Sequence, residues 1–293
     1  MADIFEVRDL HKSFGSVKVI NGLSFTVEEG SIFGFVGQNG AGKTTTMKMA
    51  LGLLETDGGE ITVCGRKAVF GETDKSVGYL PDVPEFYNYM KPMEYLTLCG
   101  EISGMNKTDI KKRGKELLEL VGLTKANRKI GGFSRGMKQR LGMAQALLNQ
   151  PKLLICDEPT SALDPMGRKE ILDILTEVKK QTTVIFSTHI LSDVERICDR
   201  VVFLHGGKTV LEGTISEVKR QHTDSYSVEF LNKSEAEKFA GLINGEPSGN
   251  TVIIKNTDGG KIIQKLAENM TVPVKFELLE PTLEDLYLEV TAK

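Results

Sequence analysis

Short apolar runs alternate with longer segments of helical periodicity before about residue 222. Four runs have the length and composition of buried strands, namely residues 31–36, 152–157, 182–187 and 201–204. Between them, residues 135–150 and 167–181 carry the helical pattern, and Pro151 predicts the end of the first of these helices. This rhythm is typical of an α/β core built on a parallel sheet.

The N-terminal segment has a different pattern. Residues 4–8, 17–27 and 60–64 are rich in strand-forming side chains and are separated by glycine turns. We therefore expect a small antiparallel β subdomain beside the parallel core.

The pattern changes again after His222. Strands are expected at 225–231, 251–254 and 274–278, and helices at 234–243, 260–269 and 281–290, with Ser234 capping the first helix. The order βαβαβα predicts a small α+β module of ferredoxin-like type. Residues 223–293 hold 12 acidic and 7 basic side chains, a net charge of about -5 within a chain of net charge -3, so charge also indicates domains at 1–222 and 223–293.

The length of 293 residues also suggests about two domains. With 40% hydrophobic and 26% charged residues, the composition excludes collagen-like and disordered chains. A net charge of -3 gives no reason to expect nucleic acid as a partner. No apolar run approaches the roughly 18 residues of a membrane helix, and scattered cysteines and histidines argue against a zinc site or a disulfide framework.

The strand ending at Val36 leads into Gly37-Gln-Asn-Gly-Ala-Gly-Lys-Thr-Thr45, which has the spacing GxxxxGK[ST]. Glycines let backbone N–H groups surround phosphate oxygens, and the following helix directs its positive N-terminus at the same anion. Lys43 is expected to reach the β- and γ-phosphates, and Thr44 to offer its hydroxyl to Mg²⁺. The candidate nucleotide-binding residues are Gly37, Asn39, Gly40, Gly42, Lys43, Thr44 and Thr45.

Two carboxylates, Asp157 and Glu158, follow a buried apolar run. Asp157 is a candidate Mg²⁺ ligand through water, and Glu158 a candidate general base that polarises the attacking water. His189 follows another strand, so the topology would bring it to the same sheet edge, beside the γ-phosphate. Phe14 is either a core residue or a platform that stacks on adenine.

Two short motifs resemble those of GTPases, Asn106-Lys-Thr-Asp109 and Asp164-Pro-Met-Gly167. Their order along the chain is the reverse of the GTPase order, and Asn106 opens a charged helix instead of ending a buried strand. We therefore interpret both as coincidental.

With these residues assembled, the chain resembles the ATP-binding cassette (ABC) ATPases over about residues 2–220. The phosphate loop and residues 153–158 resemble the Walker A and B motifs, Phe133–Leu141 resembles the ABC signature, Ser161–Asp164 the D-loop, and His189 the switch histidine. The resemblance implies a P-loop cassette with a helical subdomain, in which two subunits pack head to tail around two ATP molecules. It also implies that Ser134 and Gly136 contact the γ-phosphate of the partner's ATP, and that Asp164 belongs to the nucleotide site.

The family's Q-loop position is occupied by Asp82, which makes this acid a candidate Mg²⁺ ligand. Residues 83–89 are expected to form either the docking groove for a helix of a membrane subunit or an ordinary loop packed on the core. Arg135 and Met137 in the signature resemble bacterial exporters whose ATPase and membrane subunits are separate chains. The closing segment, residues 281–290, resembles the same drug, antibiotic and peptide exporters.

The leading hypothesis is an ATPase that binds ATP and Mg²⁺, forms a homo- or heterodimer, and powers export through an integral membrane partner. It would lie at the cytoplasmic face of the membrane as a peripheral subunit. Two other classes stay open at this point: a soluble ABC ATPase acting on ribosomes or DNA, and a non-catalytic, nucleotide-gated interaction module.

Overall fold

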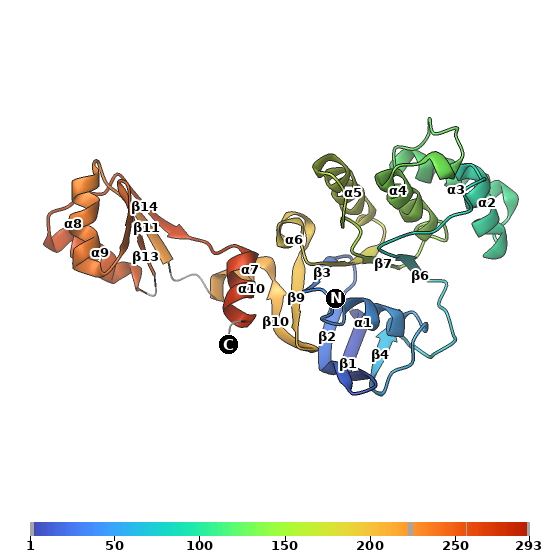
Figure 1. The fold of residues 1–293 in the computed structure, drawn as a ribbon, viewed down its shortest axis with the longest axis horizontal. Coiled ribbons are helices and arrows are strands. Elements are labelled where there is room, and N and C mark those ends of the chain that lie inside the picture. Colours follow the sequence, from blue (N-terminus) through green and yellow to red (C-terminus); the bar gives the residue numbers. More distant parts are fainter. Residues whose placement is uncertain (1–2, 222–224, 256, 292–293) are drawn as a thin grey trace. The chain divides into compact units, whose positions relative to one another are not determined.

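The computed structural model describes residues 3–221, 225–255 and 257–291 (Figure 1). The chain divides into two compact units, Met1–Ile215 and Ser216–Lys293, and each is described by itself. The domain boundary predicted between residues 222 and 223 lies outside the described residues.

A six-stranded sheet in the order β10-β9-β3-β8-β7-β6 forms the centre of the first unit. Its strands are β3 (Ile32–Gly37), β6 (Val77–Leu80), β7 (Leu153–Asp157), β8 (Thr183–Thr188), β9 (Arg200–His205) and β10 (Lys208–Thr214). Neighbouring strands from β9 to β6 run parallel, whereas β10 is antiparallel to β9. The predicted parallel core is confirmed, and β6 and β10 extend it on either side.

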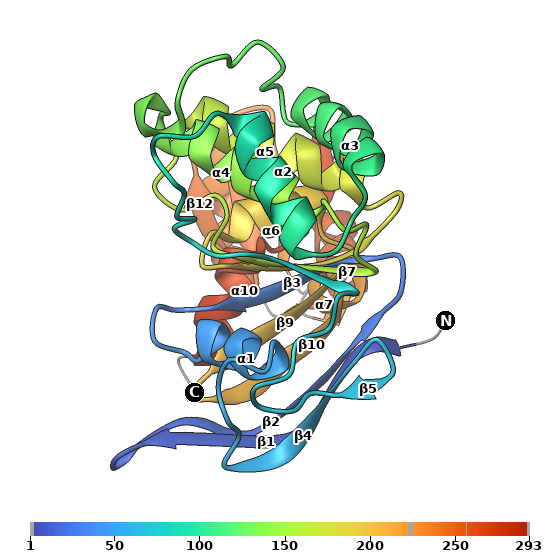
Figure 2. The ribbon, with the colours of Figure 1, turned by 90° about the vertical axis from the view of Figure 1, so that its right-hand side faces the viewer.

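Every residue of β3, β7 and β8 is buried, as expected for strands covered on both faces. Figure 2 shows the helix α1 (Lys43–Ala50) on one side of this sheet, with α5 (Pro165–Val178) and α6 (Leu191–Ile197) on the other. The phosphate loop and both acidic residues therefore lie at the carboxyl ends of the parallel strands, where ligands bind in open α/β sheets.

The helical subdomain contains α2 (Pro92–Ile102), α3 (Lys107–Leu120) and α4 (Arg135–Ala146), with a short 3₁₀ turn at Ile130–Gly132. The helix predicted at 135–150 begins at the expected residue but ends four residues early. After Ala146 the chain continues in tighter turns, in which Leu148 and Gln150 donate to the carbonyls three residues before them, and Gln150 takes a φ of +52° ahead of Pro151.

An antiparallel sheet in the order β2-β1-β4-β5 confirms the predicted β subdomain. Its strands are β1 (Asp3–Phe14), β2 (Val17–Glu28), β4 (Gly58–Val63) and β5 (Arg66–Lys67). The Phe25 ring stacks with Phe5 in its own sheet and with Phe33 and Phe35 of β3, at centroid separations of 5.7, 5.6 and 5.1 Å. These aromatic contacts join the two sheets of the first unit into one core.

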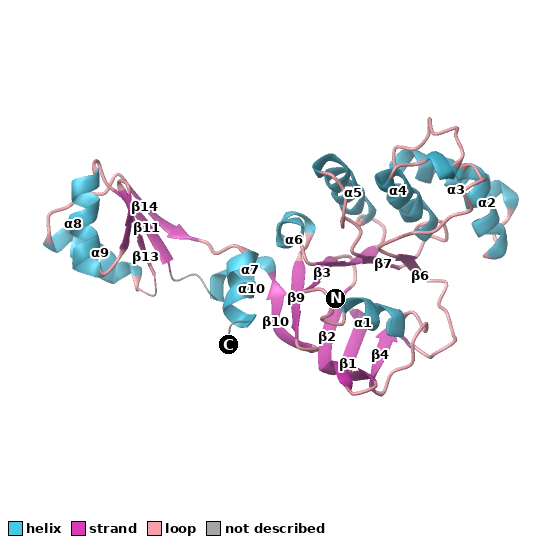
Figure 3. Cartoon of the chain, in the orientation of Figure 1, coloured by secondary structure: helices cyan, strands magenta, loops and turns pink. Residues whose placement is uncertain are grey.

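The second unit contains a four-stranded antiparallel sheet in the order β12-β13-β11-β14. Its elements are α7 (Ile215–Gln221), β11 (Ser225–Glu229), α8 (Lys233–Ile243), β12 (Glu246–Ser248), β13 (Thr251–Ile254), α9 (Gly259–Glu268), β14 (Lys275–Leu279) and α10 (Leu283–Thr291). Helices α8 and α9 lie together on one face of the sheet (Figure 3).

The succession β11-α8-β12-β13-α9-β14 is the βαββαβ arrangement of ferredoxin-like folds. The ferredoxin-like prediction is confirmed, but its βαβαβα order lacked β12. The predicted cap of α8 was also wrong: Asn232, not Ser234, accepts the backbone hydrogen bond from Glu235, at 3.0 Å. The helix therefore starts one residue earlier, with Ser234 inside its first turn.

Candidate functional site

The loop between β3 and α1 depends on glycine at two of its positions. Gly40 and Gly42 have φ values of +83° and +105°, in the region that other residues rarely occupy. A Cβ atom on Gly42 would overlap the side chain of Ile20, and one on Gly37 would lie 2.8 Å from the carbonyl oxygen of Leu204. Both packing and backbone conformation therefore hold the loop close around the start of α1.

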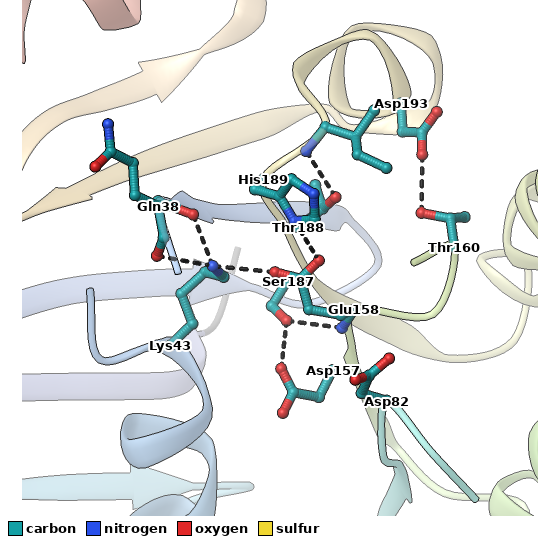
Figure 4. A network of polar contacts seen from close by, with 12 residues as sticks. Gln38, Lys43, Asp82, Asp157, Glu158, Thr160, Ser187, Thr188, His189 and Asp193 are labelled. Atoms are coloured by element: carbon teal, nitrogen blue, oxygen red, sulfur yellow. Dashed lines mark hydrogen bonds and ion pairs between the residues drawn. The ribbon is translucent and has the colours of Figure 1, made fainter. Parts of the chain in front are cut away.

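Lys43 lies at the centre of this loop, with only 4% of its side chain exposed. Its Nζ donates hydrogen bonds to the carbonyl oxygens of Gly37, at 2.6 Å, and Gln38, at 3.2 Å (Figure 4). The same ammonium lies 3.0 Å from Oε1 of Glu158. A positive charge is thus held where the loop backbone also offers N–H groups, an arrangement suited to phosphate.

Asp157, at the end of β7, is held by two hydroxyl groups. The Oγ1 of Thr44 donates to its Oδ2 at 2.6 Å, and the Oγ of Ser187 donates to its Oδ1 at 2.7 Å. The backbone N–H of Glu158 donates in turn to the Ser187 hydroxyl, at 3.0 Å. Ser187 therefore holds both acidic residues in place. The motifs did not predict this role, although the position of Ser187, two residues before His189, could have indicated it.

Glu158 lies between a cation and an imidazole. Its Oε2 is 2.8 Å from Nδ1 of His189, while its Oε1 faces Lys43. The backbone of Glu158 has a φ of +47°, so the chain turns sharply at this residue and aims the carboxylate into the site. The prediction that strand topology brings His189 to the carboxylates agrees with this geometry (Figure 4).

A cavity of about 510 Å³ opens over these groups. It is lined by Val19, Asn39, Gly40, Gly42, Lys43, Thr44, Thr45, Asp82, Glu158, Ser161 and His189. Most of the residues proposed from sequence to bind nucleotide within one chain are therefore neighbours in space.

Phe14 is not among the residues that line the cavity. It ends β1 opposite Val17, its side chain is 49% exposed, and the Nζ of Lys12 lies 5.6 Å from the ring centre. The exposure shows that Phe14 is not a core residue, and its stacking on adenine stays a prediction.

Ser134, Gly136 and Asp164 also lie outside the cavity lining. Ser134 caps α4 by accepting the N–H of Met137 at 3.3 Å, and Asp164 caps α5 by accepting the N–H of Gly167 at 2.8 Å. Around Gly136, the nearest atom to a Cβ would be a Leu163 methyl at 3.9 Å, so its backbone is open to a large neighbour. The contact of Ser134 and Gly136 with a nucleotide held by another copy stays a prediction.

Asp82 lines the cavity and forms an ion pair with Arg135 of the signature, with 3.3 Å between the Arg135 Nη2 and Asp82 Oδ1 atoms. Partial burial raises the pKa of Asp82 above its usual range; Arg135 opposes the rise, and the charges of Asp157 and Glu158 reinforce it. Asp82, at the Q-loop position, and Arg135, in the signature, therefore contact each other.

The oxygen atoms of Thr44 and Asp157 meet the requirements of Mg²⁺, which prefers hard oxygen ligands. No group of three or more His, Cys, Asp or Glu residues gathers into a metal cage among the residues that the structure describes. A site with one hydroxyl and one carboxylate fits an ion that is completed by phosphate oxygens and water.

A second polar network lies beside the site. The buried carboxylate of Asp193 accepts from the Thr160 hydroxyl at 2.8 Å and from Arg168 at 2.7 Å. Sequence patterns did not point to these three residues, which tie α6 and α5 to the loop that follows β7.

The parallel sheet, the glycine-rich loop before α1 and the acidic pair on a neighbouring strand define a P-loop nucleotide hydrolase. Residues 20–161 match the family model described as ABC transporter. The chain is 39% identical over 300 residues to the uncharacterized ABC transporter ATP-binding protein YxlF of Bacillus subtilis (strain 168), covering 98% of this chain and 99% of that protein. It belongs to the ATP-binding proteins of ABC transporters, a family that binds ATP and hydrolyses it to power transport.

Two further similarities agree with this assignment. The Nod factor export ATP-binding protein I of Rhizobium sp. (strain N33) is 36% identical over 299 residues, with 98% of this chain and 97% of that protein covered. A solved structure titled as the ATP binding subunit of an ABC transporter is 33% identical, with a TM-score of 0.66, and covers 74% of this chain and 92% of that one.

Within the described ranges of the chain, no helix is both long enough and apolar enough to cross a membrane.

Proposed function

We propose that this chain is the ATP-hydrolysing subunit of a bacterial exporter whose membrane-spanning part is a separate chain. The observation that carries the proposal is the cavity in which Lys43, Thr44, Glu158 and His189 converge. Export is supported by similarity over nearly the whole chain to a protein named for Nod factor export.

In this proposal each group has a distinct task. Lys43 exchanges its contact with Glu158 for phosphate oxygens, which releases the carboxylate to accept a proton from water. Thr44 and Asp157 supply the protein ligands of Mg²⁺, which neutralises phosphate charge when it is bound. His189 holds Glu158 by its Nδ1 and presents the other side of its ring to the cavity, towards the γ-phosphate.

The hydrolytic unit would be a head-to-tail pair of cassettes. Ser134 and Gly136 would bind the γ-phosphate held by the partner, because their surroundings leave them accessible at the start of α4. ATP that contacts both copies would favour the closed pair, and its hydrolysis would favour separation.

The membrane partner would dock on the segment that follows Asp82. In this segment Val83, Tyr87 and Tyr89 are 61, 53 and 68% exposed, so three apolar side chains face outward within seven residues. Exposed apolar patches of this kind mark contacts with other proteins. Docking here would hold the chain at the cytoplasmic face of the membrane.

The test is affinity capture of the tagged chain from membranes of its own organism, followed by identification of bound integral proteins. We expect the wild-type chain to retain an integral membrane protein, and the double substitution Tyr87→Ser/Tyr89→Ser to lose it. Val69→Ser/Phe70→Ser, two residues that are 45 and 61% exposed elsewhere on the same unit, is the matched control. Recovery of only ribosomal or DNA-bound proteins would instead favour a soluble ATPase.

A further inference from the structure

The strand β14 is an edge strand, because the sheet order β12-β13-β11-β14 gives it β11 as its neighbour on one side. Phe276 pairs with Val228, and Leu278 with Tyr226, so these side chains point to the face that α8 and α9 cover. The core cluster that the helices form with β11 and β13 contains no residue of β14, although the Phe276 ring stacks on Tyr226 with 5.3 Å between the ring centres. Val274, Phe276 and Leu278 consequently stay 57, 36 and 48% exposed, and these three residues are termed the edge stripe.

The two edges of this sheet differ in their capacity to pair with another strand. At the opposite edge β12 has only the residues Glu246-Pro247-Ser248, and Pro247 has no N–H to donate. By contrast, β14 has five residues, Lys275–Leu279, and none is proline, so the N–H groups that alternate towards its free side can bond to a further strand. Natural sheets protect their edges from pairing with proline residues and short strands. In this sheet the β12 edge has both of these features, and the β14 edge has neither.

The sequence of β14 is complementary to itself when two copies run antiparallel with Phe276 opposite Phe276. That register sets Val274 opposite Leu278 on the apolar face. On the polar face it sets Lys275 opposite Glu277 twice, once on each side of the centre. Charged side chains usually discourage edge pairing. Here Lys275 and Glu277 have opposite signs at positions symmetric about Phe276, so in the paired strands each lies opposite a charge of the other sign.

Within one copy, Nζ of Lys275 already lies 2.5 Å from Oε2 of Glu277, and Lys275 is also paired across the ladder with Glu229 of β11. The added strand would place the partner's carboxylate on the other side of the same ammonium. The row across the joined sheets would then alternate in charge instead of accumulating one sign.

We propose that β14 pairs with β14 of a second copy of this chain, antiparallel about a twofold axis through Phe276, so that two four-stranded sheets become one of eight strands. The contact is separate from the proposed head-to-tail cassette interface and does not require nucleotide. It buries the edge stripe of each copy against that of the other. Because the contact is small, association is expected to be reversible.

Charge substitutions test the register, measured by sedimentation velocity of the full chain without nucleotide. Lys275→Glu alone, or Glu277→Lys alone, places like charges opposite each other at two positions and should weaken self-association about tenfold. An equimolar mixture of the two single variants should restore association, because each then faces the opposite charge in the other chain. In the mixture, residues 275 and 277 of each variant chain still carry like charges, and only the contact between the two chains has been restored. If the mixture fails to associate, the proposed register is wrong.

A disulfide tests the position of the axis. Opposed residues in antiparallel strands have Cα atoms about 4.5–5.5 Å apart, and a disulfide accepts about 4.4–6.8 Å. Phe276→Cys should therefore give a covalent dimer under mild oxidation. Ser248→Cys, at the opposite edge, should stay at the background set by the four cysteines of the wild-type chain. Equal crosslinking of the two variants would overturn the proposal.

The outcomes separate this contact from the proposed nucleotide-dependent dimer. Self-association without ATP that is lost in Lys275→Glu, while ATP hydrolysis stays at the wild-type level, supports the β14 contact. A wild-type chain that remains monomeric up to about 100 μM would overturn it and leave the ATP-dependent pair unaffected. Phe276-dependent flotation with anionic vesicles by a monomeric chain would assign the edge stripe to a membrane surface and also overturn the proposal.

Discussion

The two units of the chain differ in where their charged side chains lie. Among the described residues, the buried side chains that carry a formal charge, Lys43, Asp157 and Asp193, all lie in the first unit. The core cluster of the second unit is wholly apolar, and its ion pairs, such as Lys265 with Glu268 and Lys275 with Glu277, lie on the surface.

This difference indicates which function the charged residues of each unit can serve. A buried charge is costly unless hydrogen bonds and opposite charges surround it, so the first unit retains its network for chemistry. Surface pairs contribute little stability, so the second unit can use them to select a partner. Substitutions of charge should therefore alter turnover in the first unit and association in the second.

The largest effect is expected at Glu158. Glu158→Gln removes the proposed general base while keeping the shape of the side chain, so ATP turnover should fall by about 10²–10⁴. ATP binding should persist, because Lys43 and the loop backbone remain. Phosphate release and equilibrium ATP binding measure the two quantities. Glu177→Gln, a change at a 53% exposed acid on α5, should leave both unchanged, and turnover near the wild-type level in Glu158→Gln would refute the assignment.

The next effect concerns stability. Ser187 is fully buried, and Ser187→Ala would leave Asp157 and the N–H of Glu158 each without one partner. The free energy of unfolding of the first unit should fall by about 1–3 kcal/mol. Urea unfolding of the full chain measures this change. Ser227→Ala, on the polar face of β11, is the control and should change stability by less than about 0.5 kcal/mol.

A smaller effect is expected at Phe14. If Phe14 stacks on adenine, Phe14→Ala should weaken ATP binding about tenfold, within the range known for base stacking on aromatic side chains. Isothermal titration with ATP provides the measurement. Phe70→Ala, which removes another exposed ring in the same unit, should have no effect; identical affinities for the two variants would make Phe14 an ordinary surface residue.

The smallest effects compare one acid from each unit. Burial raises the pKa of Asp82 above 3.8, so the folded state loses stability relative to the unfolded state as pH rises towards and through the folded pKa of this carboxyl. Asp82→Asn should remove that loss. Hydrogen bonds from Thr282 lower the pKa of Asp285. The ionised carboxyl therefore stabilises the folded state above about pH 3.8, and this stabilisation is lost as pH falls through the folded pKa. Asp285→Asn should remove that contribution.

Unfolding midpoints in urea between about pH 3 and pH 7 measure both variants. As pH rises, the unfolding midpoint of Asp82→Asn should increase relative to that of the wild-type chain. The midpoint of Asp285→Asn should decrease relative to wild type over the same range. Changes of the same sign would contradict the contrast between the units.

Local sequence was sufficient for the parts of the site that lie on one loop or one strand end. Lys43, Thr44, Asp157 and Glu158 could be proposed because their spacing follows a strand, a turn and a helix start. Ser187 and the contact between Asp82 and Arg135 could not, since they depend on which segments become neighbours across 30 and 53 residues of chain.

The errors in the fold have similarly local causes. The strand β12 has three residues and contains Pro247, so it lacks the alternating pattern by which longer strands are found. At the start of α8, Asn232 and Ser234 are both good caps, and only the structure shows that Asn232 accepts the N–H of Glu235. Charge and periodicity indicated a second domain, while its sheet order required the structure.

The proline in β12 also has a consequence for the size of any assembly built on this sheet. A sheet with two open edges can add copies without limit and grow into a filament, whereas one with a single open edge can only close on itself. With Pro247 at one edge and the edge stripe at the other, pairing through β14 leaves no second edge suited to addition. Replacing that proline would be expected to convert a closed pair into a chain of subunits that can elongate.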